Sequence, residues 1–363
     1  MKTKLLIRLF FLFTILVGVP MVFTGCIDPK PMPPKKMDVD TFPPFMPTYL
    51  EFKVPEGFPE MEIPSDNALT QEGVFLGRKL FYDPILSGDS TLSCAGCHKQ
   101  RDAFSDDRRF SIGIDGSIGN RQAMQIINAG WMTKLFWDGR ANSLEEQALG
   151  PVENPIEMKA HWPMVVDRLK EHTEYPLLFH KAFGTADITK ELAVKAIAQF
   201  ERTMVSYHSK FDRERLGKVF YSVEEQDGYD MFFSERGDCF HCHGGVLLTD
   251  NTFHNNGLDS IPEDIGLEKV THSEFDRGLF KTPTLRNIEL TAPYMHDGRF
   301  RTLEEVIDFY SEGLQKSKTI DPLMKAIRNG GKHFSPYEKK ALLAFLKTLT
   351  DTSFVHNPAY RAL

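Results

Sequence analysis

Two short motifs contain four of the five cysteines in this 363-residue chain, and each has the form C-x-x-C-H. They are Cys94-Ala-Gly-Cys97-His98 and Cys239-Phe-His-Cys242-His243. Two thiols one helical turn apart can add to the two vinyl groups of one porphyrin, and the histidine that follows can bind its iron. The motifs therefore predict two covalently attached c-type haems.

Two other uses of paired cysteines remain open from the spacing alone. A zinc site could combine both C-x-x-C units, although such units usually lie close together and Cys239 is 145 positions beyond Cys94. Two disulfide bonds are the second alternative. Covalent haem is favoured because a histidine follows the second cysteine in both copies.

The first residues predict export from the cytoplasm. In residues 1–25 three basic residues precede an apolar run, which Pro20 interrupts and which is too short for a permanent transmembrane helix. Cys26 follows Thr-Gly, as at a lipoprotein processing site, so lipidation of Cys26 and simple cleavage are both open. Export to the periplasm agrees with the motifs, because c-type haem is attached on the outer side of the bacterial membrane.

The charge of the chain argues against nucleic acid as a partner. The net charge is −7 at pH 7, and removal of residues 1–25, which contain three basic and no acidic residues, makes it −10. Such a chain repels phosphate backbones but would attract a small basic electron donor. Residues 26–64 are rich in proline and predict a stiff, extended tether between membrane and domain.

The rest of the chain repeats one plan twice, with helical spacing of Leu and Ala and no long alternating run. The corresponding segments are 73–81 and 228–233, then 137–146 and 296–305, and finally the amphipathic segments 191–204 and 336–349. We therefore expect an all-α fold with little or no β-sheet. Two cytochrome c-like haem domains in tandem are predicted at 65–212 and 213–351, followed by a tail at 352–363.

These motifs resemble those of the bacterial di-haem cytochrome c peroxidase and MauG superfamily over residues 65 to 351. The shared motifs are S-C-A-G-C-H, F-W-D-G-R-A, E-Q-A-x-G-P-V, I-E-M, the second C-x-x-C-H and T-P-T-L-R-N-x-x-L-T-A-P-Y-M-H-D-G. The resemblance implies an enzyme that reduces hydrogen peroxide to water with electrons from a small cytochrome c or cupredoxin. It assigns the peroxide reaction to the first domain and electron uptake to the second.

For the first haem, the resemblance implies His98 as the proximal ligand and an open position opposite it. Peroxidases that rest in an inactive form have a histidine in a Ser-Ile-Gly-His context, whereas this chain has Ile114 there. Isoleucine cannot bind iron. The alternative is that another histidine fills the position, with His161, His172 and His180 as candidates.

The resemblance also assigns three residues to the reaction itself. Gln147 would donate a hydrogen bond to peroxide, Glu157 would move a proton between its two oxygens, and Trp137 would relay electrons between the haems. Without the resemblance, Gln147 would merely continue a helix and Glu157 would be a solvated loop residue. Trp137 would be a core aromatic, a role that is compatible with electron relay.

For the second haem, the resemblance implies His243 as the proximal ligand and Tyr310 as the sixth ligand. Peroxidases have methionine at the sixth position, and a tyrosine phenolate there is the MauG-like choice. A phenolate stabilises ferric iron and should lower the potential of this haem. A shifted alignment would instead allow Met295 or Met324.

Further positions follow from the resemblance. Thr291 and Pro293 match the pair whose backbone carbonyls bind an inter-domain calcium ion, although Gln122 replaces the asparagine that is the third ligand. Arg286 is expected to pair with haem propionates. His296 belongs to the same network or is a structural histidine.

The sequence is therefore compatible with three functions. The first is a peroxidase. The second is a MauG-like oxidase that uses peroxide to oxidise side chains of a partner protein, which Ile114 and Tyr310 together favour. The third is a plain electron carrier with both irons six-coordinate, which predicts no reaction with peroxide.

Overall fold

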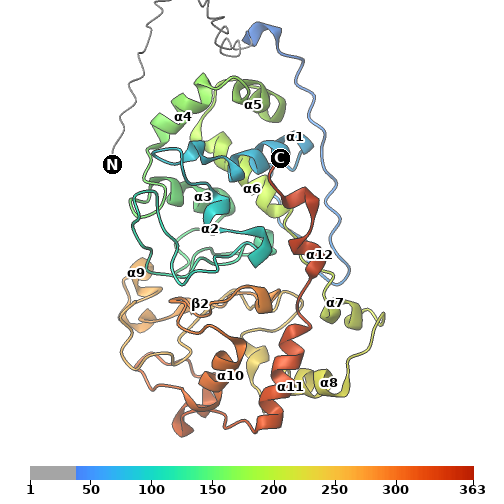
Figure 1. Cartoon of the computed structure of the whole chain (residues 1–363), viewed down its shortest axis with the longest axis vertical. Helices are drawn as coiled ribbons and strands as arrows, with labels where there is room; N and C mark the ends of the chain where they lie inside the picture. Colours follow the sequence, from blue (N-terminus) through green and yellow to red (C-terminus); the bar gives the residue numbers. More distant parts are fainter. Residues whose placement is uncertain (1–37) are drawn as a thin grey trace, which may run out of the picture. The chain divides into compact units, whose positions relative to one another are not determined.

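Helices and loops dominate the computed structural model, which describes residues 38–363 (Figure 1). The export signal, Cys26 and the first part of the tether lie outside these residues. The α-helices are α1 (Gln71–Tyr82), α2 (Cys94–Cys97), α3 (Leu144–Glu153), α4 (Trp162–Glu171), α5 (Tyr175–Phe183), α6 (Lys190–Arg202), α7 (Lys210–Arg215), α8 (Val223–Phe232), α9 (Glu268–Thr271), α10 (Leu303–Glu312), α11 (Pro336–Lys347) and α12 (Thr352–Val355).

Short 3₁₀ turns and one small sheet complete the described part. The turns are Val39–Thr41, Pro84–Leu86, Gln100–Asp102, Ala129–Trp131, Cys239–His241, Glu274–Asp276, Ile288–Leu290, Lys325–Asn329 and Pro358–Tyr360. The antiparallel strands are β1 (Phe253–His254) and β2 (Phe280–Lys281). The predicted helical fold with little sheet is therefore confirmed. Between residues 38 and 363, no helix combines the length and apolar character that a bilayer crossing requires.

The same helix-to-helix contact occurs twice in the fold. A Cβ atom on Gly77 of α1 would lie 1.8 Å from the carbonyl oxygen of Ala196 on α6, and one on Gly228 of α8 would lie 2.0 Å from that of Ala341 on α11. Each site also places the Cβ of a phenylalanine, four residues after the alanine, within 3.0 Å. The backbones of both helix pairs therefore touch at a residue that has no side chain.

The Gly228→Ala variant is expected to lower the free energy of unfolding by about 1–3 kcal/mol, because α8 and α11 would have to separate. Gly150→Ala is the matched control. It adds the same methyl group to the exposed side of α3, where the nearest atom, in Phe136, would be 3.5 Å away, so it should be neutral or stabilising. Denaturant unfolding of both variants measures the difference in stability. Equal denaturant midpoints for the two variants would contradict the close contact between α8 and α11.

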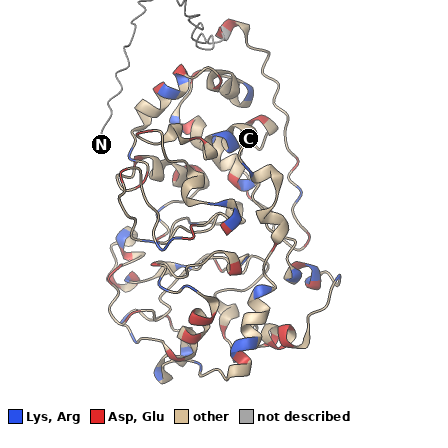
Figure 2. Ribbon diagram, viewed as in Figure 1, with Lys and Arg blue, Asp and Glu red and all other residues tan. Residues whose placement is uncertain are grey.

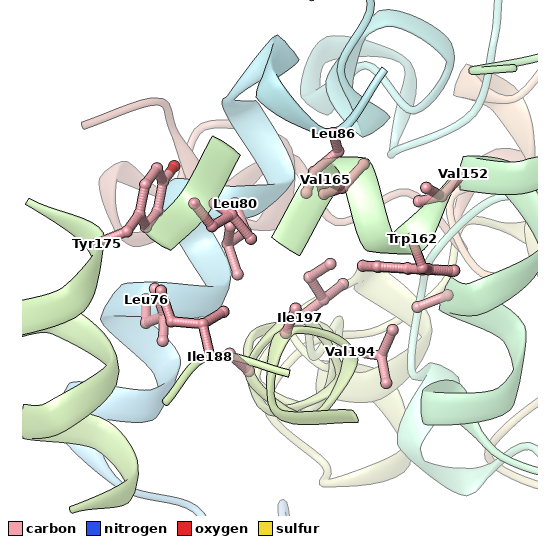
Figure 3. Packing of buried hydrophobic residues seen from close by; sticks show 14 of the residues in the cluster. Leu76, Leu80, Leu86, Val152, Trp162, Val165, Tyr175, Ile188, Val194 and Ile197 are labelled. Atoms are coloured by element: carbon pink, nitrogen blue, oxygen red, sulfur yellow. The ribbon is translucent and has the colours of Figure 1, made fainter. Parts of the chain in front are cut away.

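Two separate hydrophobic cores support the two helix pairs. In the first core, drawn in Figure 3, side chains of α1, α3, α4, α5 and α6 pack together, and Trp162 of α4 is among the buried ones. The second core lies around Phe345 of α11 and includes side chains of α7, α8 and α10. Each core draws its residues from one half of the sequence, residues 76–197 and 211–349 respectively.

A third core joins the C-terminal end of the chain to the first helix pair. Phe354 and Tyr360 are buried against Phe104, and the third core also contains residues of α1 and α6. The Tyr82 hydroxyl of α1 donates a hydrogen bond to the Tyr360 carbonyl at 2.5 Å. Figure 1 shows the C-terminus beside α1. The segment predicted as a tail is therefore packed, and the described residues form one compact unit.

Residues 42–64, which we name the strap, are extended and lie against the same unit. The Trp131 indole N–H donates to the Pro59 carbonyl at 2.8 Å, and the rings of Phe52 and Phe58 pack on Trp131. Met61 of the strap is buried beside them. The described part of the predicted tether is thus extended, as its prolines indicate, but attached to the body.

Candidate haem sites and the wall between them

A cavity of about 710 Å³, which we name the N cavity, opens beside the first C-x-x-C-H motif and is lined by Cys97 and His98. The motif itself forms α2, a single helical turn. The His98 Nδ1–H donates to the carbonyl of Phe104 at 2.9 Å, which leaves Nε2 with a free lone pair. Burial lowers the pKa of His98 and so favours the neutral imidazole that can bind iron.

The second motif repeats this arrangement at a cavity of about 240 Å³, which we name the C cavity. Cys239, Cys242 and His243 line it. The His243 Nδ1–H donates to the carbonyl of Leu248 at 3.3 Å, and burial lowers the pKa of His243 to about 4. Again Nε2 is the nitrogen left to bind a metal.

The residues at both cavities fit covalently attached haem. Their four thiols are free rather than joined in disulfides, and the two motifs line separate cavities, so they do not meet as one zinc site. Burial raises the pKa of the Cys94 and Cys239 thiols, which are therefore neutral. A porphyrin needs this combination of an apolar cavity, two thiols and one neutral imidazole with a free nitrogen.

Gln147 and Glu157 both line the N cavity together with His98. Gln147 lies on α3, which ends at Glu153. The chain then turns back at Asn154, so that Glu157 returns to the same cavity. The Asn154 side-chain amide donates to Glu157 Oε1 at 2.5 Å, and burial raises the pKa of Glu157. The structure thus brings together the two residues that the resemblance assigns to peroxide.

No second histidine lines the N cavity in the described part of the chain. The Ile114 N–H donates to the Glu157 carbonyl at 3.0 Å, and Ile114 itself is not among the residues that line the cavity. The three alternative histidines lie at the two ends of α4 and on α5. They are His161, His172 and His180.

Glu201 of α6 is a further residue of the N cavity, and sequence reasoning missed it. Its side chain is buried, and Oε2 has no hydrogen-bond partner among the described residues. Burial raises the pKa of Glu201 to about 8. The neighbouring Arg202 offers it no hydrogen bond, because its guanidinium is held by Glu145 at 2.7 and 2.9 Å. The signal in the sequence was a charged residue on the apolar face of an amphipathic helix.

The pKa of Glu201 predicts a pH-dependent stability. The carboxyl titrates near 4.5 when exposed and near 8 when folded, so between these pH values unfolding releases a proton and stability falls as pH rises. Glu201→Gln removes this loss. Its stability relative to the wild type should grow by about 1.4 kcal/mol per pH unit across the window and then level off. Denaturant unfolding at several pH values tests this prediction. If the free energy of unfolding changed with pH in the same way in Glu201→Gln and the wild type, the prediction would be wrong.

Five residues line both cavities in the described structure, and we name them the wall. They are Gln122, Gln125, Trp137, Lys281 and Pro283. The Trp137 indole N–H donates to the Gln122 carbonyl at 2.8 Å, and its ring meets the ring of His296 edge-on with centroids 6.4 Å apart. Trp137 thus lies between the two cavities, where a relay of electrons would need it.

All three candidates for the sixth ligand of the second haem line the C cavity. They are Tyr310, Met295 and Met324. The Asn256 side-chain amide donates to the Tyr310 hydroxyl at 3.1 Å and lies 3.7 Å from the Met295 sulfur. Burial raises the pKa of Tyr310 to about 12. All three side chains line the same cavity, so the preference for Tyr310 as the sixth ligand still rests on the resemblance.

The residues predicted to bind calcium line a cavity, whereas the arginine predicted to pair with haem propionates does not. Thr291 and Pro293 line the C cavity, as does Gln122 of the wall. Arg286 lines neither cavity. Its guanidinium is fully buried, is bound to Asp212 at 2.9 and 2.7 Å, and donates its remaining N–H groups to backbone carbonyls. This geometry gives Arg286 a structural role and does not support its predicted pairing with haem propionates.

Comparisons with known proteins agree with this site. A family model described as di-haem cytochrome c peroxidase matches residues 71–219. The methylamine utilization protein MauG of Methylorubrum extorquens is 37% identical over 302 residues, covering 82% of this chain and 83% of that protein. Cytochrome c551 peroxidase of Nitrosomonas europaea is 36% identical over 280 residues, covering 76% and 79%.

A solved structure extends the likeness to the fold. It is that of a MauG-like protein associated with microbial copper homeostasis, with a TM-score of 0.81 and 38% identity, and it covers 86% of this chain and 99% of that chain. The chain therefore belongs to the di-haem cytochrome c peroxidase and MauG family, as its motifs predict. Membership of this family implies two c-type haems.

Proposed function

We propose that this protein is a di-haem peroxidase that reduces hydrogen peroxide to water with electrons from a small cytochrome c or cupredoxin. The observation that carries the proposal is the N cavity, where His98 is the one histidine among the described lining residues and Gln147 and Glu157 face the same space. Peroxidase names among the relatives agree with it. In this proposal residues 65–212 form the peroxidatic domain and residues 213–351 the electron-transfer domain.

Haem, when bound, supplies an iron that can pass electrons to peroxide. The protein moves the proton that cleavage of peroxide requires. Asn154 holds the carboxyl of Glu157 at the N cavity, where Glu157 takes a proton from one peroxide oxygen and returns it to the other. The amide of Gln147 donates a hydrogen bond that orients peroxide. One hydrogen peroxide, two electrons from the donor and two protons taken up from solvent give two waters.

Electrons are taken up at the C-terminal domain and reach the N cavity through the wall. Trp137 is the aromatic residue that lines both cavities, which supports its role as the relay. Acidic and basic residues are interspersed along the described elements (Figure 2), so the proposed attraction of a basic donor rests on the net charge of the whole chain.

A second function is favoured by one specific residue. Tyr310 at the C cavity, together with Ile114 in place of a histidine, supports a MauG-like oxidase that draws electrons from side chains of a partner protein. Two of the relatives are named MauG. A plain electron carrier would have no use for a cavity with Gln147 and Glu157 beside one histidine.

The remaining parts of the proposal concern location and calcium. We place the protein in the periplasm on the basis of residues 1–25, with attachment to the membrane if Cys26 carries lipid. Calcium bound by the carbonyls of Thr291 and Pro293 stays a prediction. Gln122, at the position of the third ligand, uses its amide N–H to donate to the Asp106 carbonyl at 3.3 Å.

Steady-state oxidation of a reduced small cytochrome c by peroxide tests the proposed function, using the fully oxidised holoprotein as isolated. Fast turnover without prior reduction supports a peroxidase with an open first haem. Slow turnover, with a stoichiometric change of the haem spectrum on adding peroxide, supports the MauG-like oxidase. No spectral change with peroxide leaves only the electron carrier.

A further inference from the structure

Lys281 carries a buried positive charge in the wall. Its side chain is 3% exposed, and it is the only charged residue among the described residues that line both cavities. The ammonium contacts two neutral groups, the Thr282 carbonyl oxygen at 3.3 Å and the Met132 sulfur at 3.4 Å. Neither contact neutralises the charge.

A buried ammonium without a carboxylate is costly, and buried charges in proteins are normally paired. Burial lowers the pKa of Lys281 to about 8, while the charge of Asp250 favours the protonated form. The ammonium is therefore still the main form at pH 7. An anion placed in either cavity would relieve this cost.

Two arginines that lie close to wall residues in the sequence have carboxylate partners. Arg121 is bound by Asp138 and Asp264, each at 2.6 Å. Arg286 is bound by Asp212, as described above. Among the described residues that line both cavities, Lys281 is thus the one cation, and no carboxylate pairs with its ammonium.

The backbone fixes the position of Lys281 relative to the proposed relay. Its N–H donates to the carbonyl of Trp137 at 2.9 Å, and β2 pairs it with Phe253 of β1. The segment that carries the ammonium is thus tied directly to the segment that carries the indole.

We propose that Lys281 is a counter-charge shared by both haems, with its ammonium binding propionate carboxylate at the wall. The inference rests on the two haems of the proposed function and adds the residue that couples them electrostatically. A fixed positive charge stabilises the reduced, more negative state of each haem and so raises both potentials. Lys281 is then a positioning residue for the haems and takes no part in the proton transfers.

Redox titration of the two haems in the holoprotein, without peroxide, tests this proposal. In Lys281→Met both midpoint potentials should shift to more negative values, whereas Lys281→Arg, which keeps the charge, should stay close to the wild type. Lys269→Met is the matched control. It removes an exposed lysine of the N cavity that Asp264 already neutralises, so its shifts should be smaller and confined to the first haem.

A shift of only one potential, or of neither, in Lys281→Met overturns the shared counter-charge. Equal shifts in Lys281→Arg and Lys281→Met would also overturn it, because they would indicate a packing effect. If the methionine variant does not fold, Lys281→Gln replaces it in the same comparison. Because the titration contains no peroxide, its result is independent of whether the protein proves to be a peroxidase.

Discussion

Glu157→Gln is expected to slow the reaction with hydrogen peroxide by about 100-fold or more while both haems stay attached. Glutamine has the shape of glutamate and keeps an oxygen for the hydrogen bond from Asn154, but it cannot accept and return a proton. The side chain is half-buried beside the N cavity, and this burial raises its pKa. Stopped-flow mixing of the oxidised protein with peroxide measures the rate.

Glu153→Gln is the control for this experiment. It changes an exposed carboxyl of the same segment, four residues earlier on α3, and should leave the rate unchanged. Haem content, measured from the absorption spectrum, should be equal in both variants and the wild type. An unchanged rate in Glu157→Gln would remove this residue from the mechanism.

Tyr310→Met should raise the potential of the second haem strongly, on the order of 0.1–0.4 V within the ~0.8 V range that axial ligands span. A neutral thioether stabilises ferrous iron, whereas a phenolate stabilises ferric iron. The first haem should change little. Redox titration of the two haems measures the shift, and the same variant should turn over faster as a peroxidase if the MauG-like state depends on the phenolate.

Met295→Leu and Met324→Leu are the controls for the ligand. Both methionines line the C cavity, so each could reach iron if Tyr310 does not. With Tyr310 as the ligand, neither substitution should move the potential much. A large shift in one of them, together with none in Tyr310→Met, would identify that methionine as the ligand instead.

The haem-attachment residues could be predicted because their chemistry depends on local spacing. Two thiols and a histidine within five positions need no knowledge of the fold, and the structure places each motif at its own cavity. The helical class followed from the periodicity of the apolar residues. Gln147 and Glu157 were different, since nothing local distinguishes them from a helix residue and a loop residue. Only the resemblance connected them to one site.

Residues whose role depends on distant partners could not be predicted. Arg286 seemed available for a carboxylate, but its partner Asp212 lies 74 positions earlier in the chain. Glu201 and Lys281 are charged residues in segments that otherwise contribute to buried structure, and only the cavities show which space they face. The packing of the strap against the body could not be predicted from its sequence, because proline-rich segments are extended whether or not they are bound.

The packed segment after α11 has a consequence for the first haem site. The ring of Phe104 packs against those of both Phe354 and Tyr360, and the carbonyl of the same Phe104 orients the imidazole of His98. The segment after α11 therefore completes the support for His98, the predicted ligand of the first haem. A chain that is cut short after α11 would keep the four cysteines and two histidines of the haem-attachment motifs. It would lack the aromatic side chains that pack against Phe104 and so support His98.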